Sequence, residues 1–105
     1  MKTRICEYDM YSTFDRVGEG VMAQVEIEID ETKSTLEEAV SLKSVYFKKE
    51  DADYIDSFGG SKKKWVKAVL DIFQDNPEEL AEAFFYENDE NYNKLPSHLQ
   101  LDDRR

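Results

Sequence analysis

The sequence predicts an α+β fold in which strands come first and helices follow. Residues 21–30, VMAQVEIEID, alternate apolar and acidic side chains with the period of a half-buried strand. Residues 61–73 instead repeat apolar side chains every three or four positions, as an amphipathic helix does. Gly59 and Gly60 come directly before that helix and are typical of the end of an earlier one.

The first segment, residues 1–41, is predicted to be an acidic, β-hairpin-like unit. Residues 3–11 alternate loosely and predict a strand that precedes the one at 21–30. Residues 15–20 predict the turn between them, because two glycines there supply backbone freedom.

A short helix and a third strand are predicted next. Ser34 or Thr35 can cap a helix that runs to about Leu42, since a hydroxyl side chain accepts a hydrogen bond from the free amides at a helix start. Residues 43–47, KSVYF, are rich in β-forming side chains and predict a strand. This strand belongs to a second unit, residues 42–74, with the order strand, helix, helix.

The helices predicted after that strand differ in character. Residues 48–58 carry a narrow apolar stripe, and residues 61–73 carry a strong one. The last segment, residues 75–105, is predicted to be an acidic helix at 77–88 and a polar tail. Because the tail from about Asn88 lacks periodic apolar positions, we expect it to be dispensable for folding.

Charge is distributed unevenly along this chain of 105 residues and net charge −10. Residues 1–41 hold four basic and ten acidic side chains, and residues 75–105 hold three basic and nine acidic ones. Residues 42–74 hold seven basic and five acidic side chains, so a basic island lies between two acidic flanks. Such blocks favour different partners for different segments.

The residue types of most catalytic and metal sites are scarce. One cysteine, Cys6, excludes a disulfide within the chain, and it lies far in sequence from the one histidine, His98. We therefore expect no enzyme, no metal and no cofactor. No run reaches the roughly 18 apolar residues of a membrane span, and no signal-peptide pattern is visible, so a soluble cytoplasmic protein without membrane contact is expected.

Three lysines at the start of the helix at 61–73 suggest an anion site. Lys62, Lys63 and Lys64 oppose the partial positive charge of a helix N-terminus, where a bound phosphate would offset the repulsion. The same lysines are also compatible with a solvated patch that has no ligand. A contact with an acidic partner protein, or with the chain's own acidic tail, is a third possibility.

Residues 42–74 resemble the ribbon-helix-helix family of DNA-binding proteins. The resemblance lies in the order of strand, helix, glycine turn and helix, and in the pattern of the second helix. The residues that fit this pattern are Ser61, Lys62, Trp65, Val66, Ala68, Val69 and Leu70.

The resemblance implies a homodimer in which the two strands pair antiparallel and enter the major groove of double-stranded DNA. Val45 and Phe47 would face the core. Ser44 and Tyr46, with Leu42 on the same side, would face the bases.

The resemblance also implies a phosphate contact at Gly60, Ser61, Lys62, Lys63 and Lys64. The function that follows is a small transcriptional regulator, or an antitoxin-type repressor whose acidic flank binds a second protein. The wide apolar face of the helix at 61–73 likewise leads us to expect a homodimer, because a small monomer has little surface with which to cover it.

The overall charge favours a different function. An acidic, phage-type inhibitor would occupy a nucleic-acid-binding surface on a partner protein, as a DNA mimic does. Glu26, Glu28 and Asp30, on the acidic side of the strand at 21–30, would then be the partner-binding residues.

Overall fold

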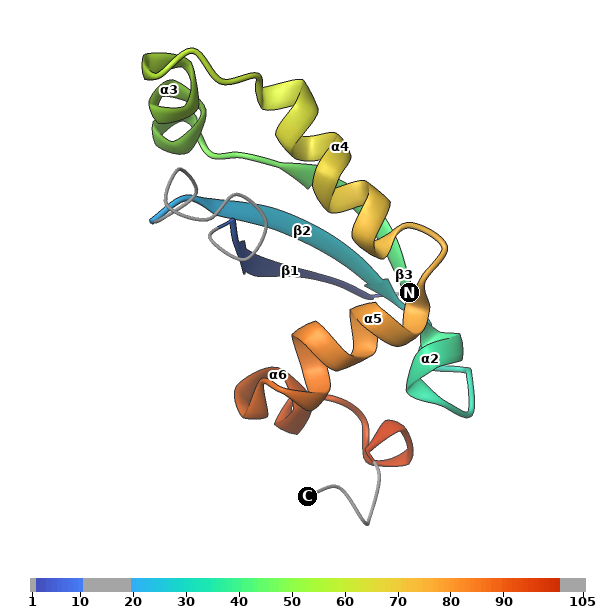
Figure 1. Ribbon diagram of the computed structural model, residues 1–105. Coiled ribbons are helices and arrows are strands. Elements are labelled where there is room, and N and C mark those ends of the chain that lie inside the picture. The colour runs from blue at the N-terminus through green and yellow to red at the C-terminus, as the bar shows by residue number, and fades with distance from the viewer. Residues whose placement is uncertain (1, 11–19, 101–105) are drawn as a thin grey trace.

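The computed structural model describes residues 2–10 and 20–100 and confirms the α+β class. A three-stranded antiparallel sheet, in the order β1-β2-β3, is followed by several helices. Figure 1 shows α4 alongside β3, α3 beyond one end of the strands and α2 at the other end.

The first two strands follow the predicted alternation. β1 (Lys2–Asp9) pairs with β2 (Met22–Ile29), and Cys6 lies opposite Val25. The turn predicted at 15–20 lies outside the described residues except for Gly20, whose φ of 79° is a conformation that glycine adopts readily.

The short helix is capped as predicted but ends earlier. Thr35 is the N-cap of α2 (Leu36–Ala39), and its hydroxyl accepts a hydrogen bond from the Glu38 amide. The third strand, β3 (Val40–Tyr46), begins directly after α2, so the prediction of a helix to about Leu42 is wrong. The β-branched Val40 continues the chain in an extended conformation and pairs with Ile29 of β2.

β3 pairs with β2 of the same chain along its whole length. The register shifts at Glu26/Ile27, so that Glu26 lies opposite Ser44 and Ile27 lies opposite Leu42. Lys43 is therefore an extra residue, which reverses the side on which the preceding residues point. Leu42 packs against the core, and the prediction that it shares a face with Ser44 is wrong.

The helices that follow β3 fill the second half of the chain. Their bounds are α3 (Lys49–Ser57), α4 (Lys62–Phe73), α5 (Pro77–Ala81), the π-helical turn η2 (Glu82–Tyr86), α6 (Asp89–Asn93) and the short 3₁₀ turn η3 (Ser97–Leu99). No described helix is both long enough and apolar enough to cross a membrane.

The apolar face of α4 is covered within one chain. Trp65, Val69 and Phe73 are almost completely buried and belong to the same core as the sheet residues Val25 and Ile27. The width of this face consequently gives no reason to expect a homodimer.

The tail packs on the core, contrary to the sequence-based expectation. Tyr92, Leu95 and Leu99 are buried in the same apolar cluster as the sheet. The Asn91 carbonyl accepts a hydrogen bond of 2.7 Å from Arg4 of β1, and the Asn91 side chain donates one of 3.0 Å to the Phe84 carbonyl. These contacts connect the last helices to the first strand.

Candidate functional site

The two faces of the sheet have different environments. Arg4, Cys6 and Tyr8 point toward the helices: Arg4 and Cys6 contact Asn91, and Tyr8 packs against Phe73 and Phe84. Alternation places the residues of β1 that lie between these, with their partners on β2 and β3, on the opposite side of the sheet, here called the open face. The open face consists of Thr3, Ile5, Glu7, Asp9, Met22, Gln24, Glu26, Glu28, Ser41, Ser44 and Tyr46.

The open face is acidic around two exposed apolar side chains. Ile5 and Tyr46 keep 53% and 41% of their surface exposed, although both lie on strands. Ile5 lies opposite Glu26 of β2, and Tyr46 lies opposite Gln24. The two apolar side chains lie on the outer strands, with Gln24 and Glu26 of β2 between them. Exposed aromatic and aliphatic side chains beside polar ones are common at protein–protein interfaces.

Hydrogen bonds hold two of the carboxylates in place. The Ser44 hydroxyl donates to Glu26 Oε1 at 2.7 Å, and Lys43 Nζ lies 3.6 Å from Glu26 Oε2. The Gln24 amide donates to Glu7 Oε2 at 3.4 Å, and Gln24 itself is buried. Among the residues that the structure describes, none forms an ion pair or hydrogen bond with the Glu28 carboxylate.

The two predicted sets of site residues meet on this face. Ser44 and Tyr46, expected to contact DNA bases, share it with Glu26 and Glu28, expected to contact a partner protein. Ser44 and Glu26 are hydrogen-bonded to each other, so a phosphate backbone that approached Ser44 would also meet the Glu26 carboxylate.

Asp30 has a structural role in the turn after β2. Its carboxylate accepts hydrogen bonds from the Thr32 hydroxyl at 2.6 Å and from the Thr32 amide at 3.1 Å. These bonds lower the pKa of Asp30 below its ordinary value, because they stabilise the ionised form. Both bonds hold the Asp30 side chain against Thr32 of its own turn.

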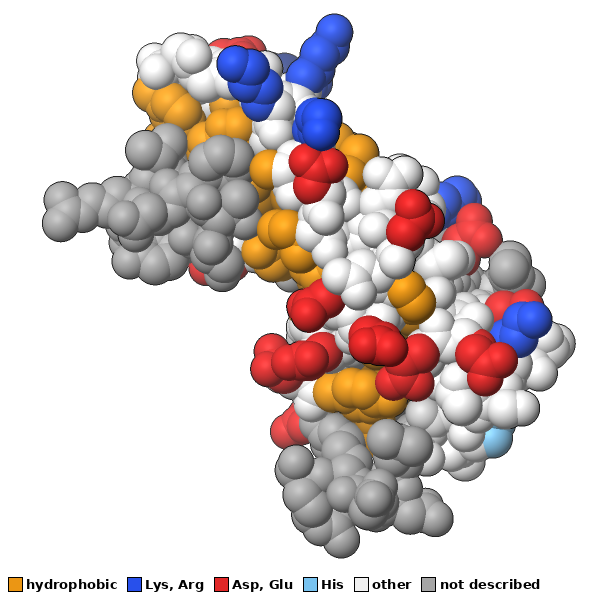
Figure 2. Space-filling view, turned by 45° about the vertical axis from the view of Figure 1, so that its right-hand side comes forward, with side chains coloured by type: hydrophobic (Ala, Val, Ile, Leu, Met, Phe, Trp, Pro, Cys, Tyr) orange, Lys and Arg blue, Asp and Glu red, His pale blue; other side chains and the backbone are white. Residues whose placement is uncertain are grey.

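The lysine cluster lies away from the open face, at the start of α4. Lys62, Lys63 and Lys64 are exposed, and the Ser61 hydroxyl caps the helix by accepting a hydrogen bond from the Lys64 amide at 3.4 Å. Figure 2 shows a group of basic side chains at one end of the molecule, and mainly acidic ones with a few further basic ones over the remainder of the visible face.

Gly60 has a packing role next to this cluster. A Cβ at Gly60 would lie 2.8 Å from the Phe58 ring and 2.9 Å from the Ile55 side chain. The glycine therefore allows the chain to turn closely over the end of α3. Close packing alone therefore explains why a glycine occupies position 60, whether or not a phosphate binds there.

Cys6 is a protonated core thiol. Burial raises the pKa of the Cys6 thiol to about 11, although the charge of Arg4 and a hydrogen bond from Asn91 act in the opposite direction. His98 contacts the Glu31 carbonyl at 2.8 Å, far from Cys6 in sequence. Within residues 2–10 and 20–100, no group of three or more acidic, cysteine or histidine side chains is arranged to hold a metal ion.

Glu7 was not singled out in the sequence, because β1 alternates only loosely. Glu7 lies between Cys6 and Tyr8, so its side chain points to the opposite face of the strand. That alternation is the signal that could have placed it on the same face as Glu26.

Comparison with protein-family models, with curated proteins and with solved structures finds no match to this chain.

The first turn of α3 yields a pH-dependent prediction. Partial burial, with repulsion from Glu50 and Glu7, raises the pKa of Asp51 despite the opposing charge of Lys48. The folded state therefore binds this proton more tightly than the unfolded state, and the stability that it contributes is lost as pH rises through the raised pKa.

We expect Asp51→Asn to raise the melting temperature at pH 7, by a few degrees at most. The gain should disappear when the pH falls below the ordinary range of an aspartate. Asp53→Asn on the same helix is the control, because Asp53 accepts a hydrogen bond of 2.9 Å from Lys49 and should gain nothing. Thermal melts of the three proteins across this pH range give the result, and equal shifts for both variants would contradict it.

Proposed function

We propose that the chain binds a positively charged, nucleic-acid-binding surface of a partner protein through the open face of its sheet, and thereby blocks that surface. The observation that carries the proposal is the placement of Glu7, Glu26 and Glu28 on one face of the sheet together with the exposed Ile5 and Tyr46. The strand backbone holds these side chains in a constant arrangement, which limits the entropy lost on binding.

Electrostatics support a basic partner over a nucleic acid. The net charge of −10 attracts a basic surface over a distance and repels a polyanion. At close range, Ser44 lies within 2.7 Å of a carboxylate oxygen rather than beside a cation. The charged residues of the open face are acidic. The nearest basic residue on these strands is Lys43, the extra residue of β3, and it lies near Glu26.

The exposed apolar residues support a protein partner rather than a simple ion. Ile5 and Tyr46 would bury their surface against the partner, and tyrosine is enriched at interfaces because it combines an apolar ring with a hydroxyl. The carboxylates around them would pair with lysines or arginines of the partner.

The decisive variant is the double substitution Glu26→Gln and Glu28→Gln. With the wild-type protein immobilised, we expect capture of basic nucleic-acid-binding proteins from a cell extract and their release by added duplex DNA. The double variant should weaken the capture about tenfold, since each exposed ion pair contributes up to about 1 kcal/mol. Titration of a captured partner by surface plasmon resonance measures the change.

The matched control is Glu78→Gln with Glu79→Gln, which removes the same charge from exposed positions on α5. This control should retain the affinity of the wild-type protein. An equal loss in both double variants would show that total charge alone is responsible. A shift of duplex DNA by the wild-type protein at about 50 mM salt would instead support the DNA-binding regulator.

A further inference from the structure

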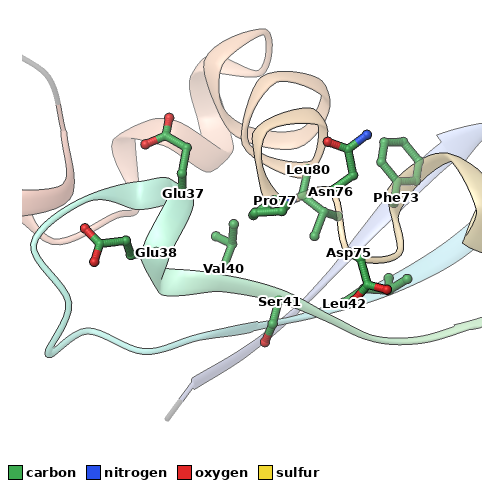
Figure 3. A pocket seen from close by; sticks show the side chains of 10 residues that line it. All are labelled: Glu37, Glu38, Val40, Ser41, Leu42, Phe73, Asp75, Asn76, Pro77 and Leu80. Carbon is green, nitrogen blue, oxygen red and sulfur yellow. The ribbon is translucent and has the colours of Figure 1, made fainter.

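A cavity of about 350 Å³ lies between the first residues of β3 and the corner that joins α4 to α5. Its floor is apolar, with Val40 and Leu42 from β3 and Phe73 and Leu80 from the helices. Figure 3 shows Val40 and Leu80 between Glu38 and Asp75, with Leu42 and Phe73 at the Asp75 end of the site. The cavity does not include Glu26 or Glu28, so it is separate from the carboxylates of the proposed interface.

β3 brings an unpaired strand edge to this cavity. It is the last strand of the sheet, and no other strand of the described residues pairs with its outer side. The Asp30 amide donates to the Ala39 carbonyl at 2.8 Å, in the same register that places Leu42 opposite Ile27. Because hydrogen bonding alternates along an antiparallel pair, the amide and carbonyl of Leu42 point away from β2.

The rim of the cavity is acidic at both ends. The Glu37 carboxylate accepts a hydrogen bond of 2.7 Å from the Tyr86 hydroxyl, and the Glu38 carboxylate accepts one of 2.9 Å from Thr35. Burial and the nearby charge of Glu37 together raise the pKa of Tyr86 well above its usual range, so this hydroxyl remains a donor. Among the described residues, none donates a hydrogen bond to the Asp75 carboxylate or pairs with it.

An apolar floor with an acidic rim matches the chemistry of lysine and arginine. Their side chains combine an aliphatic stem with a charged head, and they bury the stem while the head stays at the surface. An edge strand, for its part, matches an extended backbone, which can add to the sheet through main-chain hydrogen bonds.

We propose that this cavity is a docking site for an extended basic segment of a partner protein. The segment pairs with the outer edge of β3 at Leu42, and an arginine or lysine lays its stem against Leu42 and Pro77, which are only half-buried, with its head at Asp75 or Glu38. The site is independent of the open face, so the failure of either proposal leaves the other intact.

The test uses the full chain and the peptide acetyl-Thr-Arg-Thr-Arg-Thr-amide, in which both arginines lie on one side of an extended strand. In an ¹⁵N–¹H NMR titration, we expect shifts at residues 40–42 and at Asp75. Hydrogen exchange of the Leu42 amide should slow about tenfold or more at saturation, because the amide gains a partner. The same peptide with glutamine in place of arginine should bind at least about tenfold more weakly, since it loses two ion pairs.

Asp75→Asn is the variant that tests the rim. Asp75 has a φ of 57°, a left-handed conformation that asparagine also tolerates, so this change removes the charge and leaves the backbone intact. We expect about fivefold weaker binding of the arginine peptide, the loss of roughly one exposed ion pair. Glu79→Gln, on the exposed side of α5, is the control and should bind as the wild-type protein does.

Three results would overturn the proposal. They are equal affinity for the arginine and glutamine peptides, a Leu42 amide that exchanges equally fast with and without peptide, and a dimer mass in light scattering with the Leu42 amide already protected. The last result would show that a second copy of the chain occupies the β3 edge.

Discussion

Removal of residues 89–105 is expected to leave the chain largely unfolded at room temperature. The deletion takes away Tyr92, Leu95 and Leu99, which are each at most 4% exposed in the common core. Truncation of one buried leucine to alanine alone costs about 2–5 kcal/mol. The summed cost of losing the three side chains is as large as most or all of the total free energy of unfolding of a domain, which is roughly 5–15 kcal/mol.

The deletion also removes polar contacts that β1 and η2 need. Arg4 loses the Asn91 carbonyl at 2.7 Å, and the Phe84 carbonyl loses the Asn91 amide at 3.0 Å. A buried polar group without a partner is unfavourable by about 1–3 kcal/mol, so these losses add to those of packing.

Circular dichroism and urea unfolding of the truncated chain measure this effect. Leu95→Ala is the milder variant, with an expected loss of about 3 kcal/mol. Asn93→Ala, on the exposed side of α6, is the control and should stay within about 0.5 kcal/mol of the wild-type protein. A truncated chain that melts cooperatively within a few degrees of the full chain would show that the tail contributes little to the core.

Phe73→Ala is the single substitution from which we expect the largest loss of stability. The Phe73 ring is 2% exposed and packs on Tyr8 of β1 with a centroid distance of 5.3 Å and on Phe84 of η2 with one of 5.0 Å. It therefore joins the sheet, α4 and η2 at one point. A buried phenylalanine replaced by alanine costs about 3–5 kcal/mol, and part of that loss reflects aromatic contacts.

The matched control is Phe58→Ala, at a phenylalanine that is 42% exposed and packs on Trp65 with a centroid distance of 5.7 Å. We expect the control to lose about 1 kcal/mol. The midpoint of urea unfolding separates the two variants. Equal losses would mean that the core does not depend on the Phe73 contacts described above.

Sequence alone was sufficient where the structure depends on near neighbours. The alternation of residues 21–30 predicted β2, since a half-buried strand needs that period whatever lies on top of it. Ser61 predicted the start of α4, and the pair Ser34 and Thr35 predicted that of α2, where Thr35 is the cap, because a cap bonds to an amide three residues away. The strong acidity is likewise a property of composition.

Tertiary structure decided which of these local features meet. The extra residue at Lys43 turns Leu42 toward the core, and no local pattern marks that bulge. Strand pairing brings Ser44 to Glu26, 18 positions away along the chain, and so places two separately predicted sets of site residues on one face. Such contacts depend on the register between strands, and a shift by one residue would exchange the two faces.

The tail shows the same division. Tyr92, Leu95 and Leu99 have the three- and four-residue spacing of one helical face, but Pro96 interrupts the segment. They belong instead to a five-residue helix, its end and a 3₁₀ turn. The three side chains are buried in the same apolar cluster as the sheet, and η2 and β1 supply the hydrogen-bond partners of Asn91. Burial of a side chain in so short an element depends on the surface against which it packs, and that surface exists only once the sheet and α4 have come together.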